Sequence, residues 1–219
     1  KVQVLSHVVT WGNNLWGQLY LPADLENLAA ISAGGYHSLG LKIDGTVVAW
    51  GSNLSGQCNV PAGLSDVTAI AGGYAHSLAL KSDGVVIAWG ADESGQCNVP
   101  AGLSNVVGIA AGSSHNLALR SNGAVVAWGN NGEGQCNVPV DLDNVVSIVA
   151  GEAYVLAFRA DGTVAGWGRN WGNQCTLPVD FTGTVALAAG GNTSVALFLA
   201  DAEDTVAPEL FGCQEQVLL

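Results

Sequence analysis

The sequence predicts an all-β protein, a β-propeller of five blades with 39 residues each. The first observation is a Trp-Gly pair with an unbroken 39-residue period, at Trp11, Trp50, Trp89, Trp128 and Trp167. A fixed period of this length is typical of propellers and solenoids, which repeat one supersecondary unit. The second observation is that each unit holds three strand-like segments and no sustained helical period. The third is that the two ends of the chain complement each other.

Each unit divides into three predicted strands, as the second unit illustrates. Residues 67–71, 76–80 and 85–89 are apolar or alternating segments separated by turn signals. Asp-Gly or Asn-Gly joins the last two strands in the first four units, and such pairs favour tight hairpins because they accept positive φ. In the middle strand, large Leu78 and Leu80 alternate with small Ser77 and Ala79. Such a sheet can pack tightly between neighbours on both faces, as propeller blades do.

Three positions are identical in all five units, so the unit itself requires them. They are the glutamines 18, 57, 96, 135 and 174, the prolines 22, 61, 100, 139 and 178, and the glycines 34, 73, 112, 151 and 190.

The ends of the chain predict how the ring closes. The last unit lacks its third strand, because the position one period after Trp167 is Val206. The chain begins, however, with an unattached strand of this type at residues 7–11. We therefore expect the N-terminal strand to complete the last blade and close a monomeric ring over residues 1–200, which would remove two exposed sheet edges. The alternative is an arc of a larger ring, completed by missing residues or by a second chain.

Residues 201–219 differ from the repeats. An acidic, proline-containing linker leads into an apolar, strand-like end. This segment resembles the opening of immunoglobulin-like modules in large bacterial surface proteins. We therefore expect the start of a further, truncated β module, and an extracellular or cell-surface location for the whole protein.

Composition narrows the range of partners. The 219 residues carry a formal net charge of −12, with a pI near 4.3. A chain this acidic repels phosphate groups, so nucleic acid and anionic membranes are not expected partners. No apolar stretch has the length and purity of a membrane helix, so membrane insertion is not expected either.

The repeat resembles that of a known family. The pattern Trp-Gly-x-Asn-x-x-Gly-Gln, followed by Ala-Gly-x-x-His-Ser-Leu-Ala-Leu-x-x-Asp-Gly-x-Val, is similar to the regulator of chromosome condensation repeat over residues 7–200. The resemblance implies a β-propeller and is greatest to a bacterial branch that includes a β-lactamase inhibitory protein. The eukaryotic founder of the family is a nucleotide exchange factor that docks on chromatin. Five units are fewer than the seven blades typical of the family.

Neither a catalytic centre nor a metal or cofactor site is predicted. The sequence has no phosphate loop, nucleophile elbow, zinc motif or Cys-x-x-Cys pair. His37, His76 and His115 share one repeat position, where we expect each to form a hydrogen bond within its own blade. Four cysteines, at 58, 97, 136 and 175, share a position that is Leu19 in the first unit, and we expect free buried thiols. Cys213 is the better candidate for a disulfide.

Strand order predicts one variable face. The Gly-x-x-His turn and the Trp-Gly loop lie at the same end of each blade, opposite the Asp-Gly turns, and variable loops on a rigid frame commonly bind partners. Exposed tryptophan and tyrosine often anchor ligands. The candidate binding residues on this face are Trp16, Tyr36, Tyr74, Glu93, Glu133, Glu152, Arg169, Trp171 and Asn192. Ring closure would make the loops of Trp171 and Trp16 neighbours.

The resulting hypothesis is a non-catalytic binding or adhesion module that presents this face to a protein or a glycan. The alternatives are an inhibitor of a secreted enzyme and a structural spacer.

Overall fold

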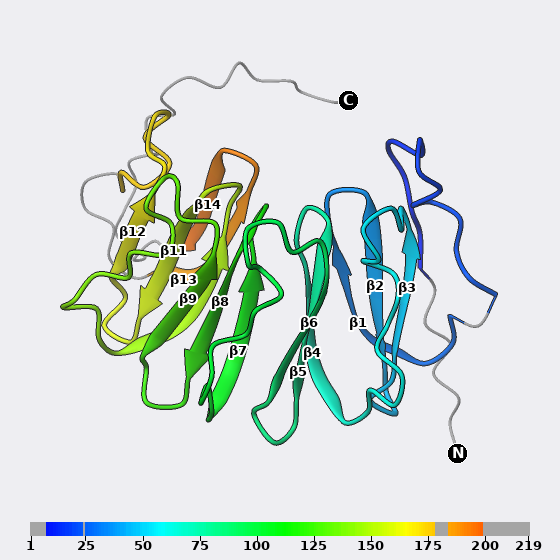
Figure 1. Cartoon of the computed structure of the whole chain (residues 1–219). Coiled ribbons are helices and arrows are strands. Elements are labelled where there is room, and N and C mark those ends of the chain that lie inside the picture. Colours follow the sequence, from blue (N-terminus) through cyan, green and yellow to red (C-terminus); the bar gives the residue numbers. More distant parts are fainter. Residues whose placement is uncertain (1–7, 24, 178–183, 199–219) are drawn as a thin grey trace.

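The computed structural model describes residues 8–23, 25–177 and 184–198, which form five sheets arranged in an arc (Figure 1). The strands are β1 (Leu28–Ala33), β2 (His37–Lys42), β3 (Val47–Gly51), β4 (Val67–Gly72), β5 (His76–Lys81), β6 (Val86–Gly90), β7 (Val106–Ala111), β8 (His115–Arg120), β9 (Val125–Gly129), β10 (Val145–Ala150), β11 (Tyr154–Arg159), β12 (Val164–Gly168), β13 (Thr184–Gly190) and β14 (Thr193–Phe198). The all-β propeller fold and the three-strand unit are therefore confirmed.

Each of the first four sheets is an antiparallel meander in chain order, for example β4-β5-β6. We call the five sheets blades 1 to 5. The first strands of successive blades contact one another, β1 with β4, β4 with β7, β7 with β10 and β10 with β13, so these strands line the axis of the arc. No helix of the described ranges is long and apolar enough to cross a membrane.

The Asp-Gly turns form the predicted hairpins. In blade 1, Gly45 has φ 80°, which favours glycine, and Asp44 Oδ1 accepts hydrogen bonds from the amide and the hydroxyl of Thr46 at 2.9 and 2.6 Å. These hydrogen bonds lower the pKa of the Asp44 carboxyl. Asp161 makes the same bonds to Thr163 in blade 4. The aspartates are therefore turn residues.

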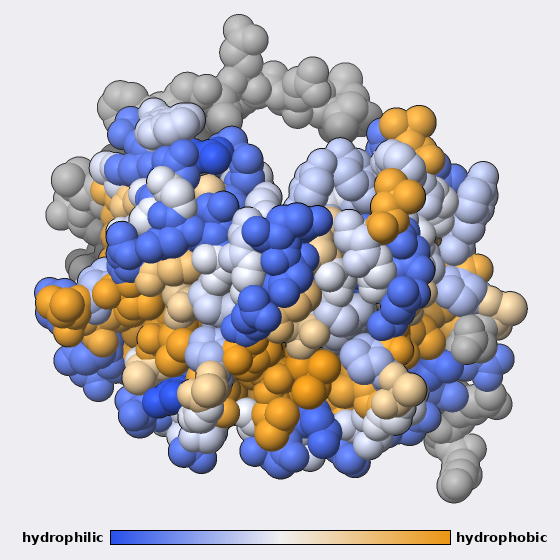
Figure 2. Space-filling model, viewed as in Figure 1, coloured by the Kyte–Doolittle hydropathy of each residue, from blue (hydrophilic) through white to orange (hydrophobic). Residues whose placement is uncertain are grey.

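The core lies between the blades. In one cluster Leu78 and Leu80 of β5, which are 0% and 3% exposed, pack with Val106, Ala118 and Trp128 of the next blade. The alternation of large and small residues thus lets each sheet bury side chains on both faces. In Figure 2 the loop ends at the top of the outer surface are mainly hydrophilic, and apolar side chains concentrate lower down, between the blades.

The two ends of the arc are not paired in this structure. Blade 5 contains only β13 and β14 among the described residues, and residues 8–23 lie beyond β3, away from β14 (Figure 1). The tryptophans of β3, β6, β9 and β12 are 7–8% exposed, whereas Trp11 is 82% exposed. The blade number of the complete ring and its closure by the N-terminal strand therefore stay predictions. Pro178, Cys213 and the module expected at 201–219 lie outside the described residues.

The cysteines correct one expectation. Cys58, Cys97, Cys136 and Cys175 are free as expected, but they are half-buried rather than buried. They lie in the loops, where each thiol donates a hydrogen bond to a backbone carbonyl, as Cys58 Sγ does to Ser52 O at 3.1 Å. Burial raises the pKa of the Cys58 thiol to about 11, so it stays protonated and unreactive at neutral pH.

Candidate functional site

The predicted loop face is assembled around the axis of the arc. Turns between the first and second strands of neighbouring blades are joined by backbone hydrogen bonds, with Gly35 N donating to Gly73 O (3.0 Å) and Tyr74 N to Ser113 O (3.2 Å). Ser113 N and Glu152 N continue the series to Glu152 O and Gly191 O at 3.1 and 2.8 Å. The five turns surround one opening of about 460 Å³. Residues far apart in the sequence therefore share one rim.

In the first three blades the histidine behind the turn leaves no space for a side chain at the invariant glycine. A Cβ at Gly73 would overlap the ring of His76. His76 Nε2 in turn lies 2.7 Å from Asn116 Oδ1, and His37 Nε2 lies 2.9 Å from Ser77 Oγ. Each of these partners belongs to the next blade, so the expectation of a bond within one blade is wrong. Stacking of the blades thus joins the rings of His37 and His76 to the middle strand of the next sheet.

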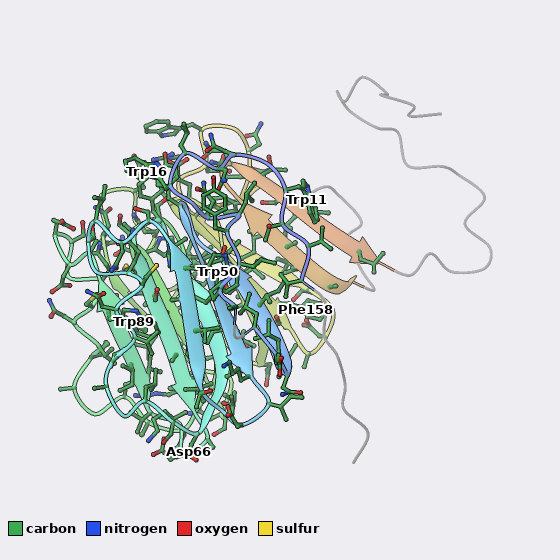
Figure 3. The ribbon with its side chains drawn as sticks, turned by 90° about the vertical axis from the view of Figure 1, so that its right-hand side faces the viewer. Trp11, Trp16, Trp50, Asp66, Trp89 and Phe158 are labelled. Atoms are coloured by element: carbon green, nitrogen blue, oxygen red, sulfur yellow. The ribbon has the colours of Figure 1, made fainter. Side chains whose placement is uncertain are left out.

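The opposite face carries the Asp-Gly turns. Figure 3 shows Trp16 at one end of the molecule and Asp66 at the other. Val67 N, next to Asp66, donates to Gly45 O of a neighbouring Asp-Gly turn at 3.1 Å. The two sets of loops are thus separated by the length of the strands, as the strand order predicts.

Three aromatic residues of the loop face form one cluster on blades 1 and 2, which we call the aromatic cluster. The rings of Trp16 and Tyr36 lie 6.1 Å apart, and those of Tyr36 and Tyr74 lie 5.1 Å apart in an edge-to-face arrangement. The hydroxyl of Tyr74 donates to that of Tyr36 at 3.0 Å, and this bond raises the pKa of Tyr74. Trp16 is 44% and Tyr74 is 48% exposed, so the cluster remains open to a partner.

A second group, the charged cluster, lies on blades 4 and 5 and contains five predicted residues. Arg169 Nη1 is 3.2 Å from Glu152 Oε2, and Arg169 Nε is 3.9 Å from Glu133 Oε1. Asn192 Nδ2 donates to Glu152 Oε2 at 3.0 Å. The guanidinium also lies 5.1 Å from the ring centre of Trp171, which is 80% exposed. Arg169 therefore pairs with Glu152 and lies near Glu133 and Trp171.

A polar pocket of about 270 Å³ adjoins this cluster and includes residues that the sequence analysis missed. Ser113, Ser114 and Asn130 line it together with Glu133 and Glu152. The signal was present, because Ser113 and Ser114 are the two variable residues of the Gly-x-x-His turn, equivalent to Tyr74 and Ala75. Asn130 likewise occupies the repeat position of Arg169.

The structure does not unite all nine candidates. The aromatic cluster and the charged cluster lie at opposite ends of the arc of blades, so Trp16 and Trp171 are not neighbours in this structure. Glu93 is exposed and, among the described residues, joins neither cluster. Within the described ranges, no three histidine, cysteine or acidic side chains are placed to hold a metal ion.

The cations are unevenly distributed between the two faces. The cations Lys42, Lys81, Arg120 and Arg159 share one repeat position at the end of the middle strand, beside the Asp-Gly turns. The loop face carries the four carboxylates of Asp92, Glu93, Glu133 and Glu152 and, within the described part, one guanidinium, that of Arg169. The loop face is therefore acidic as well as aromatic.

Comparison with known proteins finds a match for three of the repeat units. Residues 29–57, 67–96 and 106–135 each match the regulator of chromosome condensation (RCC1) repeat. No curated protein sequence matches the chain significantly.

Several solved propellers share the fold. Prp20p of Saccharomyces cerevisiae superimposes with a TM-score of 0.69 at 22% identity, over 83% of this chain and 58% of that one. Human WBSCR16 gives 0.70 at 19% identity, over 86% and 66% of the two chains. The ectodomain of the receptor kinase CR4 from Physcomitrella patens gives 0.67 at 24% identity, over 79% and 50%. This chain thus spans half to two thirds of the length of each of these three structures.

Proposed function

We propose that this chain, an RCC1-like β-propeller built from regulator of chromosome condensation repeats, is a non-catalytic module that binds a protein through its loop face. One observation carries the proposal: both sets of variable loops lie on one face, where Tyr74 and Glu152 line the axial opening, while the frame between the loops repeats. Variable loops on a rigid scaffold are where binding residues concentrate.

The chemistry of the face favours a basic and partly apolar partner segment. The aromatic cluster offers exposed ring surface, and rings of this kind anchor apolar and cationic side chains. The four carboxylates of the face exceed its one described guanidinium, so a lysine or arginine of the partner would reduce the net charge. The net charge of −12 would also attract a basic partner over longer range.

Structural relatives give independent support for a protein partner. Prp20p is described with binding properties toward Gsp1p and histones, and its complex with Kap60 is known. The identity to this chain is near 22%, so the likeness supports the use of the scaffold and not those partners. A glycan ligand, the secreted setting and the adhesion role rest on the sequence alone and stay predictions.

The test is a binding screen with matched variants. The probes are immobilised peptides that combine lysine or arginine with aromatic or aliphatic residues, and a panel of neutral glycans. One variant, Trp16→Ala/Tyr74→Ala, opens the aromatic cluster, and another, Glu133→Gln/Glu152→Gln, removes two carboxylates. The control, Ile43→Ala/Val85→Ala, removes exposed apolar groups near the Asp-Gly turns, where they are 63% and 43% exposed.

We expect salt-sensitive peptide binding that each loop-face variant weakens about tenfold or more, while the control retains it. Equal binding by all four proteins would contradict the proposal. Binding to glycans alone would point to sugar recognition, and no binding at all would favour a structural spacer. Circular dichroism and urea unfolding of each variant exclude loss of the fold as the cause.

A further inference from the structure

The aromatic cluster is not part of the repeated frame. The position of Trp16 is Ser55 in the second unit, and that of Tyr36 is Ala75. No other unit has an aromatic residue at these two positions or at that of Tyr74. The blades therefore fold without these three rings. Exposed apolar surface that the fold does not need commonly marks an interaction site.

The turns beneath the two tyrosines are fixed by backbone hydrogen bonds. Ser52 N donates to Tyr36 O at 2.8 Å. Tyr74 N donates to Ser113 O at 3.2 Å. The ring of Tyr74 also lies against Gly35, where an added Cβ would come within 2.8 Å of the ring atom Cδ2. Rings that are held in place before a partner arrives lose little conformational entropy on binding.

Two hydrogen-bond donors of the cluster are free to bond a ligand. The indoles of the repeated tryptophans in β3, β6, β9 and β12 each donate to a glutamine carbonyl at 2.8–3.1 Å. Within the described part of the chain, Trp16 instead uses only its backbone amide, which donates to Gln18 Oε1. The Tyr36 hydroxyl accepts the proton of Tyr74, so its own proton is available. A matching ligand therefore supplies hydrogen-bond acceptors along an apolar body.

A polyproline II segment supplies both features. It has no internal hydrogen bonds, so its carbonyls are free, whereas those of a helix or a paired strand are already bonded. Its proline rings dock on exposed aromatic side chains, and its stiff backbone loses little entropy on binding. Such a segment advances about 3.1 Å per residue, so three residues cover about 9 Å. The row of rings, with centres 6.1 and 5.1 Å apart, has the same scale.

We propose that the aromatic cluster binds a proline-rich segment of the partner in the polyproline II conformation. Trp16 Nε1 and the Tyr36 hydroxyl donate to two carbonyls of the segment, while its proline rings lie on the rings of the cluster. Figure 3 shows Trp16 at the loop end of the molecule, where such a segment has access. This inference rests on the proposed function, because it names the kind of segment that the loop face recognises.

The position of the cluster also predicts what flanks the prolines. Of the three aromatic residues only Tyr74 lines the axial opening, and Glu152 lines the same opening. The Glu152 side chain is 40% exposed. A segment that continues past Tyr74 therefore reaches a carboxylate on an acidic face. Opposite charges favour specificity and fast association, so we expect lysine or arginine directly beside the prolines.

The test is calorimetric titration of the whole chain with three synthetic peptides. The first combines consecutive prolines with a pair of lysines at one end. The second has alanine and glycine in place of the prolines and keeps the charge, and the third has serine in place of the lysines. We expect the first peptide to bind about tenfold more tightly than the second, and more tightly than the third at low salt.

Two matched variants isolate the hydrogen bond to the ligand. Tyr36→Phe and Tyr74→Phe both remove the bond between the two hydroxyls and keep both rings. Only Tyr36→Phe also removes the proton that the ligand accepts. We expect Tyr36→Phe to weaken binding of the first peptide about fivefold, and Tyr74→Phe to change it by less than about twofold.

Two further variants compare exposed tryptophans. Trp16→Ala removes a ring and its free donor, and we expect it to weaken binding of the first peptide about tenfold or more. Trp171→Ala removes the tryptophan of the charged cluster, which is 80% exposed, and should leave the affinity unchanged. Urea unfolding of each variant shows whether the fold is retained.

Equal affinity for the two lysine peptides would overturn the proposal, as would unaltered binding by Trp16→Ala or equal losses in Tyr36→Phe and Tyr74→Phe. If peptides of lysine and aliphatic residues bind the loop face while prolines add nothing, the protein-binding function stands and this inference fails. If neither kind of peptide binds, both fail. A neutral glycan whose binding is lost in Trp16→Ala would also overturn the proposal and assign the cluster to a sugar.

Discussion

The histidine at the start of the middle strand shows how single residues join the blades. Ser77 Oγ donates to Gln57 O and must therefore accept from His37 Nε2, which fixes the proton of His37 on Nε2. Asn116 connects His76 to Gln96 O in the same way. In blade 4 the connecting position is Val155, and both ring nitrogens of His115 are buried without a hydrogen-bond partner. One residue therefore interrupts a network that the repeat otherwise maintains.

Restoring that residue is a stability test. Val155→Thr keeps the side-chain shape and supplies a hydroxyl that can accept from His115 and donate to Gln135 O. We expect the free energy of unfolding to rise by about 1 kcal/mol, because a buried ring nitrogen of His115 gains a hydrogen-bond partner. Urea denaturation at neutral pH measures it. The reverse change, Ser77→Val, removes the connection to His37 and is expected to cost about 2 kcal/mol; a loss of stability for both variants would contradict the network.

At the scale of the element, the turn between the first and second strands depends on its glycine. The ring of His37, His76 or His115 occupies the space of a side chain at Gly34, Gly73 or Gly112, and Tyr154 does so at Gly151. Blade 5 differs, because Thr193 replaces the ring and nothing lies within 4 Å of a Cβ built on Gly190. The same sequence position is thus constrained in four blades and free in the fifth.

This contrast gives a matched pair of substitutions. Gly73→Ala forces the His76 ring out of place and should lower the free energy of unfolding by about 1–3 kcal/mol. Gly190→Ala meets open space at an ordinary φ and should change it by less than about 0.5 kcal/mol. Thermal or urea unfolding of both variants measures these two changes in the free energy of unfolding. Similar losses would show that the glycine is needed for backbone conformation rather than for space.

At the scale of the whole molecule, three buried histidines make stability depend on pH. Burial, together with the charge of His76, lowers the pKa of His37 and of His115 to about 4, and burial lowers the pKa of His76. The folded chain therefore holds these rings neutral while the unfolded chain protonates them near their ordinary pKa of about 6.5. Between the pKa of the folded rings and that of the unfolded rings, the unfolded state binds more protons. The free energy of unfolding is therefore highest above about pH 6.5 and falls as the pH drops toward 4.

We expect each histidine to contribute a slope of up to about 1.4 kcal/mol per pH unit within that window. Urea unfolding at pH 7, 6, 5 and 4.5 measures the slope. His115→Tyr introduces the residue that blade 4 carries at this position. This variant should remove the contribution of one histidine from the slope. A stability independent of pH between 7 and 4.5 would contradict neutral, buried rings.

The sequence by itself determined the unit and its order. The period of Trp-Gly, the Asp-Gly hairpins and the alternation around Leu78 are local patterns, and local patterns decide strands, turns and which residues face a core. Strand order alone also placed both variable loops at one end. Contacts between residues about 40 positions apart depend instead on how blades stack, and no local pattern encodes them. The direction of the histidine bonds, the grouping of Trp16 with Tyr36 and Tyr74, and the exposure of Trp11 were therefore decided only by the tertiary structure.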